Sequence, residues 1–468
     1  MRIFEILLFV SSICLWLKRI WGGIVLKSKV YWILFFSADI ILFLHIIIEG
    51  ARWQMSVIYI SLIIGLILES VSIYKGLNST SNTLTRSVIL TFILGIFALI
   101  SISIPIILPV FKLAEPTGVY SVGTSNFIYT DQSRKVSNGE PRKINVQIWY
   151  PAEIESSIKK EKYISNLSEY SAAIEKVYGV PKQLLSYLSL IDSHTYKDAP
   201  FTEKVEKAPV IFFSHGNMMG QRFTNTFQAL ELASHGYIVV AVEHPETALM
   251  SVYSNSDFVT FKGTSSGLPM EYEVQNRASK PVIEQQTLDI EFVLKQIQDM
   301  NEKNDKPTIS GRMDFDKLGI IGHSQGGATA VDVMYKNKAF KAAIDMDGYL
   351  YGEERMEALD RPLLIMNGKF EYEELKDSVE MSEAEQAKRK IVLGDLGTSI
   401  DIKEAGHLSF TDIPLYSPII EILSPKIKQN HRIINELTLV FLNKYFKEDI
   451  KDFNSLLDIY PEISLSKN

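Results

Sequence analysis

The chain has 468 residues, a formal net charge of −7 and one cysteine. Residues 1–112 carry nine Lys and Arg against four Asp and Glu, whereas residues 113–468 carry 39 against 51, a net charge of −12. An acidic surface repels phosphate backbones, which argues against nucleic-acid binding by the second part. Because Cys14 is the only cysteine, an internal disulfide, a cysteine-based zinc site and a thiol nucleophile in the second part are excluded.

The first part is predominantly apolar. A bilayer core needs about 20 residues of helix, and the last three of its four apolar stretches are long enough to span. The first is shorter, contains Glu5 and lacks a small-residue cleavage site, so we interpret it as a retained helix rather than a signal peptide. The sequence therefore predicts a transmembrane region of about four helices in residues 1–112, from the stretches Ile3–Leu17, Val30–Ile48, Trp53–Ile73 and Ser87–Phe111.

The cations of this region fall unevenly between its loops. Lys and Arg are retained on the cytoplasmic side of a membrane. The first and third loops are therefore expected to be cytoplasmic, which makes the protein a multi-pass cell-membrane protein whose acidic part is extracytoplasmic. The first loop contains Lys18, Arg19, Lys27 and Lys29, the third contains Lys75 and Arg86, and the second contains only Arg52.

Residues 113–468 alternate short apolar runs with amphipathic helical patterns, which is typical of an α/β fold with a mostly parallel sheet and crossover helices. Two antiparallel-type runs open the pattern, and six short buried-type strands follow. The predicted strands are Val119–Tyr129, Ile144–Tyr150, Val210–Ser214, Tyr237–Val242, Leu318–Ile321, Ala342–Met346, Leu363–Met366 and Ser399–Lys403. The predicted helices are Gln221–His235, Pro281–Met300, Gly326–Tyr335 and His431–Phe446.

Two segments interrupt this pattern and are candidate lids. Ile154–Phe201 separates the second and third strands, and Phe370–Arg389 is a charged helical insertion. Open α/β sheets bind ligands at the carboxyl edge of the strands, which either segment could cover. A solvated surface excursion is the alternative for the charged segment.

A nucleophile motif lies between a buried strand and a helix. Residues 322–327 read Gly-His-Ser-Gln-Gly-Gly and follow the apolar strand that ends at Ile321. A Gly-x-Ser-x-Gly pattern is weak by itself, but between a strand and a helix its glycines allow the close approach that a strained nucleophile turn requires. The sequence therefore predicts an α/β-hydrolase fold with Ser324 as the nucleophile.

A serine nucleophile needs a base and an acid that orients the base, in the chain order serine, acid, histidine. Only two histidines follow Ser324. His407 lies in a loop after the last predicted strand, whereas His431 opens a helix, so His407 is the expected base. Asp347 ends a strand beside the nucleophile turn and is the expected acid, with Asp345 and Glu371 as alternatives.

Two backbone N–H groups are expected to stabilise the developing oxyanion. Gln325 supplies one from the nucleophile turn. Asn217 is expected to supply the other from the loop after the third strand, where Gly216 permits a close backbone approach. We interpret His215 and His323 as packing or hydrogen-bonding residues. No metal-ligand pattern is apparent, so no metal or cofactor is implied.

At these residues the chain resembles the calcium-independent platelet-activating factor acetylhydrolase family of α/β-hydrolases. The resemblance covers roughly Gly118–Phe446. It rests on Ile148-Trp149-Tyr150-Pro151, Phe213-Ser214-His215-Gly216, the Gly-His-Ser-x-Gly-Gly turn, Met346-Asp347, and His407 with Phe410. It implies Ser324, Asp347 and His407 as the triad, and the Asn217 and Gln325 amides as the oxyanion hole.

The resemblance further implies a serine ester hydrolase that releases a short or oxidised acyl group from a phospholipid or related lipid. Gln325 and Gly348 replace aromatic or apolar residues of the vertebrate members, and those members lack the apolar N-terminal stretches. A general short-chain esterase or lipase, and a non-catalytic membrane-tethered binding module, are the alternative hypotheses. Acyl length, headgroup, pocket residues and oligomeric state are left open by the sequence.

Overall fold

A computed structural model describes residues 1–21, 29–75, 83–263, 271–306, 308–369, 379–448 and 453–466. The chain divides into two compact units. The first, the helical unit, comprises Met1–Phe111, Val180–Ile191 and Tyr416–Ile419. The second, the sheet unit, comprises Lys112–Gly179, Asp192–Leu415 and Ile420–Asn468.

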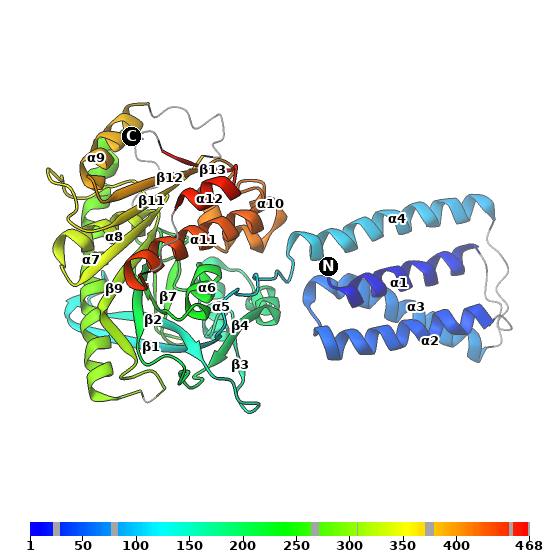
Figure 1. Ribbon diagram of the computed structural model, residues 1–468. Coiled ribbons are helices and arrows are strands. Elements are labelled where there is room, and N and C mark those ends of the chain that lie inside the picture. Colours follow the sequence, from blue (N-terminus) through cyan, green and yellow to red (C-terminus); the bar gives the residue numbers. More distant parts are fainter. Residues whose placement is uncertain are drawn as a thin grey trace. The chain divides into compact units, whose positions relative to one another are not determined.

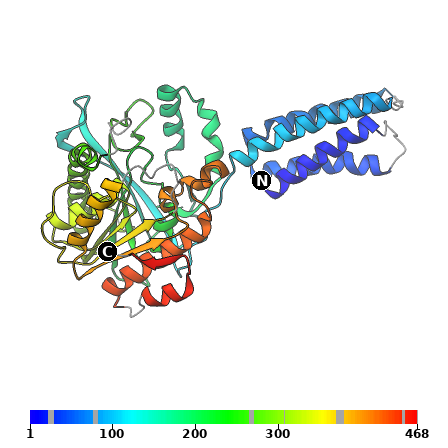
Figure 2. The ribbon, with the colours of Figure 1, turned by 90° about the horizontal axis from the view of Figure 1, so that it is seen from above.

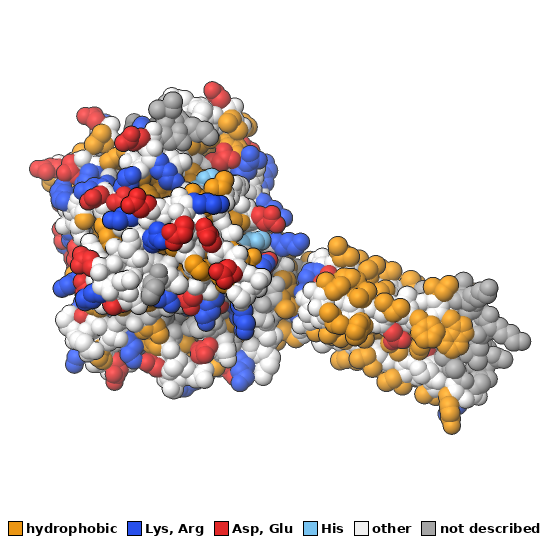
Figure 3. All heavy atoms as spheres, turned by 60° about the horizontal axis from the view of Figure 1, so that its bottom comes forward, with side chains coloured by type: hydrophobic (Ala, Val, Ile, Leu, Met, Phe, Trp, Pro, Cys, Tyr) orange, Lys and Arg blue, Asp and Glu red, His pale blue; other side chains and the backbone are white. Residues whose placement is uncertain are grey.

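Each of the four apolar stretches forms a helix of the helical unit, as predicted (Figure 1). By length and composition, two segments among the described residues are candidate membrane spans, Trp53–Val71 and Leu84–Ile107. Hydrophobic side chains cover the visible face of this unit in Figure 3. The four-helix multi-pass arrangement and its orientation stay predictions. The helices are α1 (Ile3–Trp21), α2 (Lys29–Leu44), α3 (Ser56–Tyr74) and α4 (Leu84–Ile107), with a π-helical turn η1 (His45–Glu49) and a 3-10 turn η2 (Trp53–Met55).

Buried polar side chains tie the helical unit together. Arg52 Nε donates to Glu5 Oε1 at 2.7 Å, and Arg52 Nη1 donates to the carbonyl of Leu108 at 2.7 Å. His45 Nε2 lies 2.6 Å from the hydroxyl of Tyr59. Since buried charges are stable only when they are paired and hydrogen-bonded, these contacts give both Arg52 and His45 a structural role.

Part of the first candidate lid belongs to the helical unit. The 3-10 helix η3 (Lys182–Leu190) follows helix α5 (Leu167–Tyr178), and the carbonyl of Leu184 accepts a hydrogen bond from Trp53 Nε1 at 2.9 Å. A lid role for this segment stays a prediction.

The sheet unit contains a central sheet of 11 strands within the described chain, in the order β13-β12-β11-β10-β9-β5-β6-β2-β1-β4-β3. The six neighbours from β12 to β6 are parallel. Beyond this parallel run, β13 pairs antiparallel with β12, and β2 pairs antiparallel with β6. The bounds are β1 (Ser121–Lys135), β2 (Pro141–Ala152), β3 (Lys160–Lys162), β4 (Asp192–Lys197), β5 (Ala208–Ser214), β6 (Ile238–Glu243), β9 (Met313–His323), β10 (Phe340–Met346), β11 (Leu363–Gly368), β12 (Gly397–Ile402) and β13 (Ile463–Leu465).

Helices cover both faces of this sheet (Figures 1 and 2). Helices α7, α8 and α9 share one apolar core with the strands, through residues such as Ile290, Val331 and Val392. Helices α6 and α11 pack together on the other face. The fold class predicted from the sequence is thereby confirmed. The helix bounds are α6 (Thr226–Ser234), α7 (Tyr272–Lys303), α8 (Gln325–Lys336), α9 (Val379–Leu393), α10 (Pro418–Glu421), α11 (Ile427–Phe446) and α12 (Phe453–Ile459).

Every strand and helix predicted for residues 113–468 is present, and most bounds shift by a few residues. The largest difference is in α7, which begins at Tyr272 rather than at the predicted Pro281, so that Pro281 lies inside the helix. The predicted helix Gln221–His235 begins only at Thr226, because the side chains of Thr224 and Asn225 bond to nearby backbone groups and hold residues 221–225 as a loop. Five strands were not predicted from the sequence: β3 and β4 at one edge of the sheet, β13 at the other, and a separate short hairpin of β7 (Met250–Val252) and β8 (Phe258–Thr260).

The second candidate lid is described only from residue 379 onward. Its described part belongs to α9, which connects the parallel strands β11 and β12 and buries Val392 and Leu393 in the core. The helix is a crossover connection whose buried apolar residues lie beyond the candidate segment, and a lid role for the segment stays a prediction. The remainder, residues 370–378, lies outside the described residues.

Candidate active site

The nucleophile turn is built by close backbone packing between β9 and α8. Ser324 adopts a left-handed φ of 56°, which is strained for a residue with a side chain. A Cβ on Gly322 would lie 1.8 Å from the carbonyl oxygen of Gly326, and one on Gly326 would lie 2.1 Å from that of Ser214. Both positions therefore require glycine, which is the physical reason for the sequence pattern.

His407 and Asp347 lie beside this serine. His407 opens the 3-10 helix η5 (His407–Phe410) after β12, and its Nε2 is 3.0 Å from Ser324 Oγ. The other ring nitrogen, Nδ1, is 2.7 Å from Asp347 Oδ2. The His407 side chain is 50% exposed, so a substrate can reach it. The structure thus brings together the three residues that the sequence predicted, from the ends of three parallel strands.

Asp347 is held by its backbone and by its neighbours. Its φ is 55°, and its Oδ1 accepts the backbone N–H of Gly368 at 2.7 Å. Burial would raise the pKa of Asp347, but its hydrogen bond to His407, the His407 charge and the Gly368 N–H together lower it. Asp347 is therefore ionised at neutral pH.

The pKa of His407 responds to the same contact. Burial would lower this pKa, but the hydrogen bond and the negative charge of Asp347 raise it above the ordinary value of 6.5. The neighbouring carboxylate thus favours the protonated ring that forms when His407 takes a proton from Ser324 Oγ.

The alternative acid and base residues occupy structural positions. Asp345 is fully buried and accepts the N–H of Gly348 at 3.0 Å, and burial raises its pKa well above the usual range. His431 stacks on Phe227 with ring centroids 3.7 Å apart, and burial lowers its pKa to about 4. Glu371 lies outside the described residues.

The loop after β5 passes close to the nucleophile. A Cβ on Gly216 would lie 3.1 Å from Ser324 Cβ. His215 Nε2 accepts the backbone N–H of His244 at 2.9 Å, so the proton of the neutral ring is on Nδ1, which donates to the carbonyl of Gly216 at 2.7 Å. Burial, followed by the charge of His244, lowers the pKa of His215 to about 3, which keeps the ring neutral. The orientation of the Gly216–Asn217 peptide is therefore fixed.

His323 supports the histidine loop. Its Nε2 donates to the backbone carbonyl of His407 at 3.0 Å. Burial and the neighbouring His407 lower the pKa of His323 to about 3, so its ring is neutral. His215 and His323 both have the hydrogen-bonding roles expected from the sequence.

A second hydrogen-bonded set of serine, histidine and aspartate side chains is present, which the sequence did not indicate. His244 Nε2 is 3.0 Å from Ser214 Oγ, and His244 Nδ1 is 3.0 Å from Asp289 Oδ2. All three residues are fully buried, and Arg142 forms a bidentate pair with Asp289 at 2.8 and 2.7 Å. Because no substrate reaches a fully buried hydroxyl, this second set is structural. The exposure of His407 to solvent distinguishes the set that contains Ser324.

The described part of the chain contains no group of three or more His, Cys, Asp or Glu residues that could hold a metal ion. The geometry at Ser324 instead joins a hydroxyl, an imidazole and a carboxylate in one hydrogen-bonded line. On this fold, at the carboxyl edge of the sheet, such a line defines the α/β-hydrolase class.

Comparisons with known proteins identify the family. Residues 108–462 match the family of platelet-activating factor acetylhydrolase, isoform II. The chain belongs to this family and is a carboxylic ester hydrolase that acts on lipid esters. Residues 1–107 lie outside the matched range.

Individual relatives agree with this assignment. The platelet-activating factor acetylhydrolase of Cavia porcellus is 27% identical over 379 residues, which cover 74% of this chain and 81% of the relative. The corresponding protein of Bos taurus is 25% identical over 378 residues, covering 74% and 80%. A probable 1-alkyl-2-acetylglycerophosphocholine esterase of Arthroderma benhamiae is 24% identical over 254 residues, covering 52% and 60%.

A solved structure supports the fold. The ferulic acid esterase from Streptomyces cinnamoneus superposes with a TM-score of 0.61 at 22% identity, covering 77% of this chain and all of that one. At this identity the likeness concerns the fold alone.

Proposed function

We propose that Ser324, His407 and Asp347 form the catalytic triad of this ester hydrolase. His407 Nε2 takes the proton of Ser324 Oγ as that oxygen attacks the ester carbonyl carbon. The proton then passes to the leaving alkoxide, and a water activated by the same nitrogen hydrolyses the acyl-enzyme. The observation that carries the proposal is the continuous line from Asp347 to Ser324, with distances of 2.7 and 3.0 Å.

The backbone N–H groups of Asn217 and Gln325 are the proposed oxyanion hole. In a trans peptide the N–H points away from the preceding carbonyl. Because His215 holds the Gly216 carbonyl, the Asn217 N–H is directed to the opposite side of that peptide. Gln325 begins α8, where backbone N–H groups have no partner within the helix. Two such donors stabilise the negative oxygen of the tetrahedral intermediate.

The proposed substrate is a phospholipid or related lipid with a short or oxidised acyl group. Three relatives in the comparison carry names of acetyl-ester hydrolases, and the chain spans most of two of them. Calcium independence is proposed because His407 activates the nucleophile and backbone N–H groups receive the charge, so the chemistry needs no metal ion.

A low-selectivity short-chain esterase is the second candidate. It is favoured by Gln325, whose Oε1 is buried beside the nucleophile and has no hydrogen-bond partner among the described residues. An unpaired buried amide oxygen beside the nucleophile could receive a hydrogen bond from a polar substrate group, which fits a less selective enzyme.

A chain-length series separates the two candidates. With the full-length protein in detergent micelles, we expect kcat/KM for an sn-2 acetyl phosphatidylcholine to exceed that for the palmitoyl analogue by about 100-fold, because methylenes that do not fit a pocket lose binding energy. The rate with EDTA should stay within about twofold of the rate with calcium, since no metal participates in the proposed steps. Comparable rates on simple butyrate esters and on acetyl phospholipid would favour the unselective esterase, and a calcium requirement would contradict the proposed chemistry.

We also propose that residues 1–112 form the membrane region and that residues 113–468, the hydrolase domain, are extracytoplasmic. Arg52, the only cation of the second loop, is buried against Glu5, so it does not weaken the charge asymmetry between the loops. The candidate spans Trp53–Val71 and Leu84–Ile107 support membrane association.

Cysteine labelling in whole cells tests this orientation. In a Cys14→Ser background, we expect a membrane-impermeant maleimide to label Glu155→Cys in the hydrolase domain but not Lys75→Cys, which replaces an exposed residue after α3. Permeabilised cells, in which both sites should react, are the control. The reverse pattern in intact cells would contradict the proposed orientation.

A further inference from the structure

Two side chains of α9 hold the loop that follows Asp347. Arg389 Nη2 donates to the carbonyl of Gly348 at 2.7 Å. Both carboxylate oxygens of Glu385 accept the N–H of Leu350 at 3.0 Å. Glu385 and Arg389 are one helical turn apart and pair at 2.6 Å. The helix therefore holds the loop at two backbone groups just beyond Asp347.

Arg389 also reaches the neighbouring strand. Its Nη1 donates to Asn367 Oδ1 at the end of β11. The next residue, Gly368, donates its N–H to Asp347 Oδ1 at 2.7 Å. One guanidinium thus links the ends of β10 and β11, and the Asp347 carboxylate lies between them with Oδ2 left for His407.

The backbone at this point needs such support. Asp347 has a φ of 55°, a conformation that a residue with a side chain adopts only where its surroundings enforce it. The following residue is held from both sides, since the Gly348 N–H bonds to Asp345 and its carbonyl bonds to Arg389. Glu385 is buried and the Arg389 side chain is only 17% exposed, so water is a poor substitute for these bonds.

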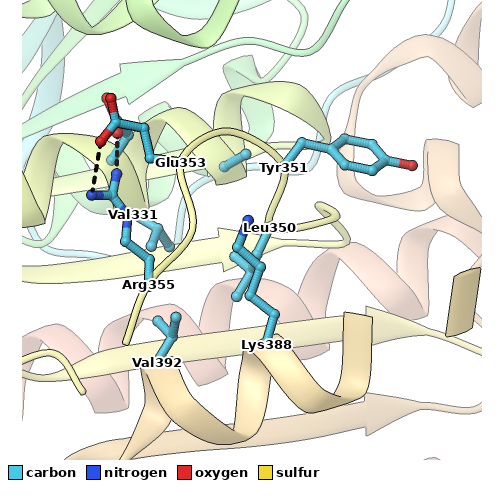
Figure 4. Close-up of a pocket in the computed structure, with 9 residues that line it drawn as sticks. Val331, Leu350, Tyr351, Glu353, Arg355, Lys388 and Val392 are labelled. Carbon is cyan, nitrogen blue, oxygen red and sulfur yellow. Dashed lines mark hydrogen bonds and ion pairs between the residues drawn. The ribbon is translucent and has the colours of Figure 1, made fainter. Parts of the chain in front are cut away.

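The space between α9 and this loop is filled by side chains. Figure 4 shows Leu350 and Tyr351 of the loop together with Lys388 and Val392 of α9. The hollow that they line with residues of α8 measures about 10 Å³, room for no more than one water molecule. A substrate therefore does not enter here, and the contact serves packing.

We propose that Glu385 and Arg389 are positioning residues for the catalytic acid. They hold Asp347 in its strained conformation and so keep its Oδ2 against His407. This inference rests on the proposed triad. It also gives a different role to the segment that the sequence suggested as a lid.

Arg389→Gln in the full-length protein tests the proposal. We expect kcat for an acetyl ester to fall about 10- to 100-fold, because small misplacements of a catalytic group are costly, while KM changes by less than about threefold. The rising limb of kcat/KM against pH should move to lower pH, because a less well-placed Asp347 raises the pKa of His407 less. Glu385→Gln, which retains one acceptor for Leu350, should change both quantities in the same direction but less.

Arg361→Gln is the matched control. Arg361 is also largely buried and donates to the carbonyls of Asn337 and Phe340 at 3.1 and 2.6 Å, at the opposite end of β10. Its loss should lower the melting temperature comparably and leave kcat and the pH limb unchanged. The proposal is overturned if folded Arg389→Gln keeps a wild-type kcat and pH limb, or if Arg361→Gln reproduces its effects. A failed triad is recognised separately, because Asp347→Asn would then also retain activity.

Discussion

Replacing Ser324 by alanine is expected to lower kcat for ester hydrolysis about 10⁶-fold, the loss typical of removing a triad nucleophile. The hydroxyl is the only group lost, and its oxygen lies 3.0 Å from His407 Nε2. Without it no acyl-enzyme forms, and the remaining acceleration comes from binding and from the oxyanion donors. The melting temperature should change little, because the strained backbone of the turn is retained.

Ser214→Ala is the matched comparison for that prediction. Ser214 also accepts or donates a hydrogen bond with a histidine at 3.0 Å, but it is fully buried. We expect it to retain kcat within about tenfold, since its loss leaves only a buried hydrogen bond unmade. Equal losses in steady-state rate for the two alanine variants would contradict the assignment of Ser324.

Asp347→Asn is expected to lower kcat about 10⁴-fold, as loss of the orienting carboxylate does in other triads. Asp347 Oδ2 accepts the proton of His407 Nδ1 at 2.7 Å and so leaves Nε2 free to accept from Ser324. An amide at this position also stabilises the opposite tautomer, in which Nε2 carries the proton. Because the charge of Asp347 raises the pKa of His407, the rising limb of kcat/KM should move to lower pH in the variant.

Asp345→Asn provides the control for the second prediction. The carboxyl of Asp345 is fully buried, and burial raises its pKa well above the usual range. Its Oδ1 accepts the Gly348 N–H at 3.0 Å, a bond that an asparagine oxygen preserves. We expect its kcat and pH limb to stay close to those of the wild type. A larger loss of kcat from Asp345→Asn than from Asp347→Asn would show that Asp345, and not Asp347, is the acid.

The turn that carries the proposed nucleophile was predictable because its signal is local. Gly322, Ser324 and Gly326 lie within five residues, and steric contact between strand and helix dictates the two glycines. His407 and Asp347 were predictable from chain order and from the rule that active-site residues follow parallel strands. These inferences needed no distances.

The residues around the triad were not predictable in the same way. Arg389 lies 41 residues from Gly348 in the sequence, and their contact depends on how α9 packs against the end of β10. Read alone, Glu385 and Arg389 belong to a charged helix that suggests a solvated surface. Similarly, Trp53 and Leu184 are 131 residues apart, and nothing in either segment predicts their hydrogen bond.

Two arrangements resemble parts of the proposed site, and distinguishing them from it takes both sequence and geometry. The sequence left Asp345 open as the acid, but its carboxylate accepts the N–H of Gly348, whereas that of Asp347 lies 2.7 Å from His407 Nδ1. Conversely, the line of Ser214, His244 and Asp289 has triad-like distances, and only its complete burial excludes it. Geometry, exposure and chain order together support the proposed site.

We propose that Ser324 is the activated serine of this hydrolase. The most direct test of this proposal is to treat the full-length protein with a fluorophosphonate and to locate the adduct by peptide mass spectrometry. A serine made nucleophilic by an adjacent base reacts with such a probe, whereas an ordinary hydroxyl does not. We expect a single adduct on Ser324 that is absent from Ser324→Ala. An adduct on Ser214, or none on an enzyme that hydrolyses acetyl esters, would contradict the proposal.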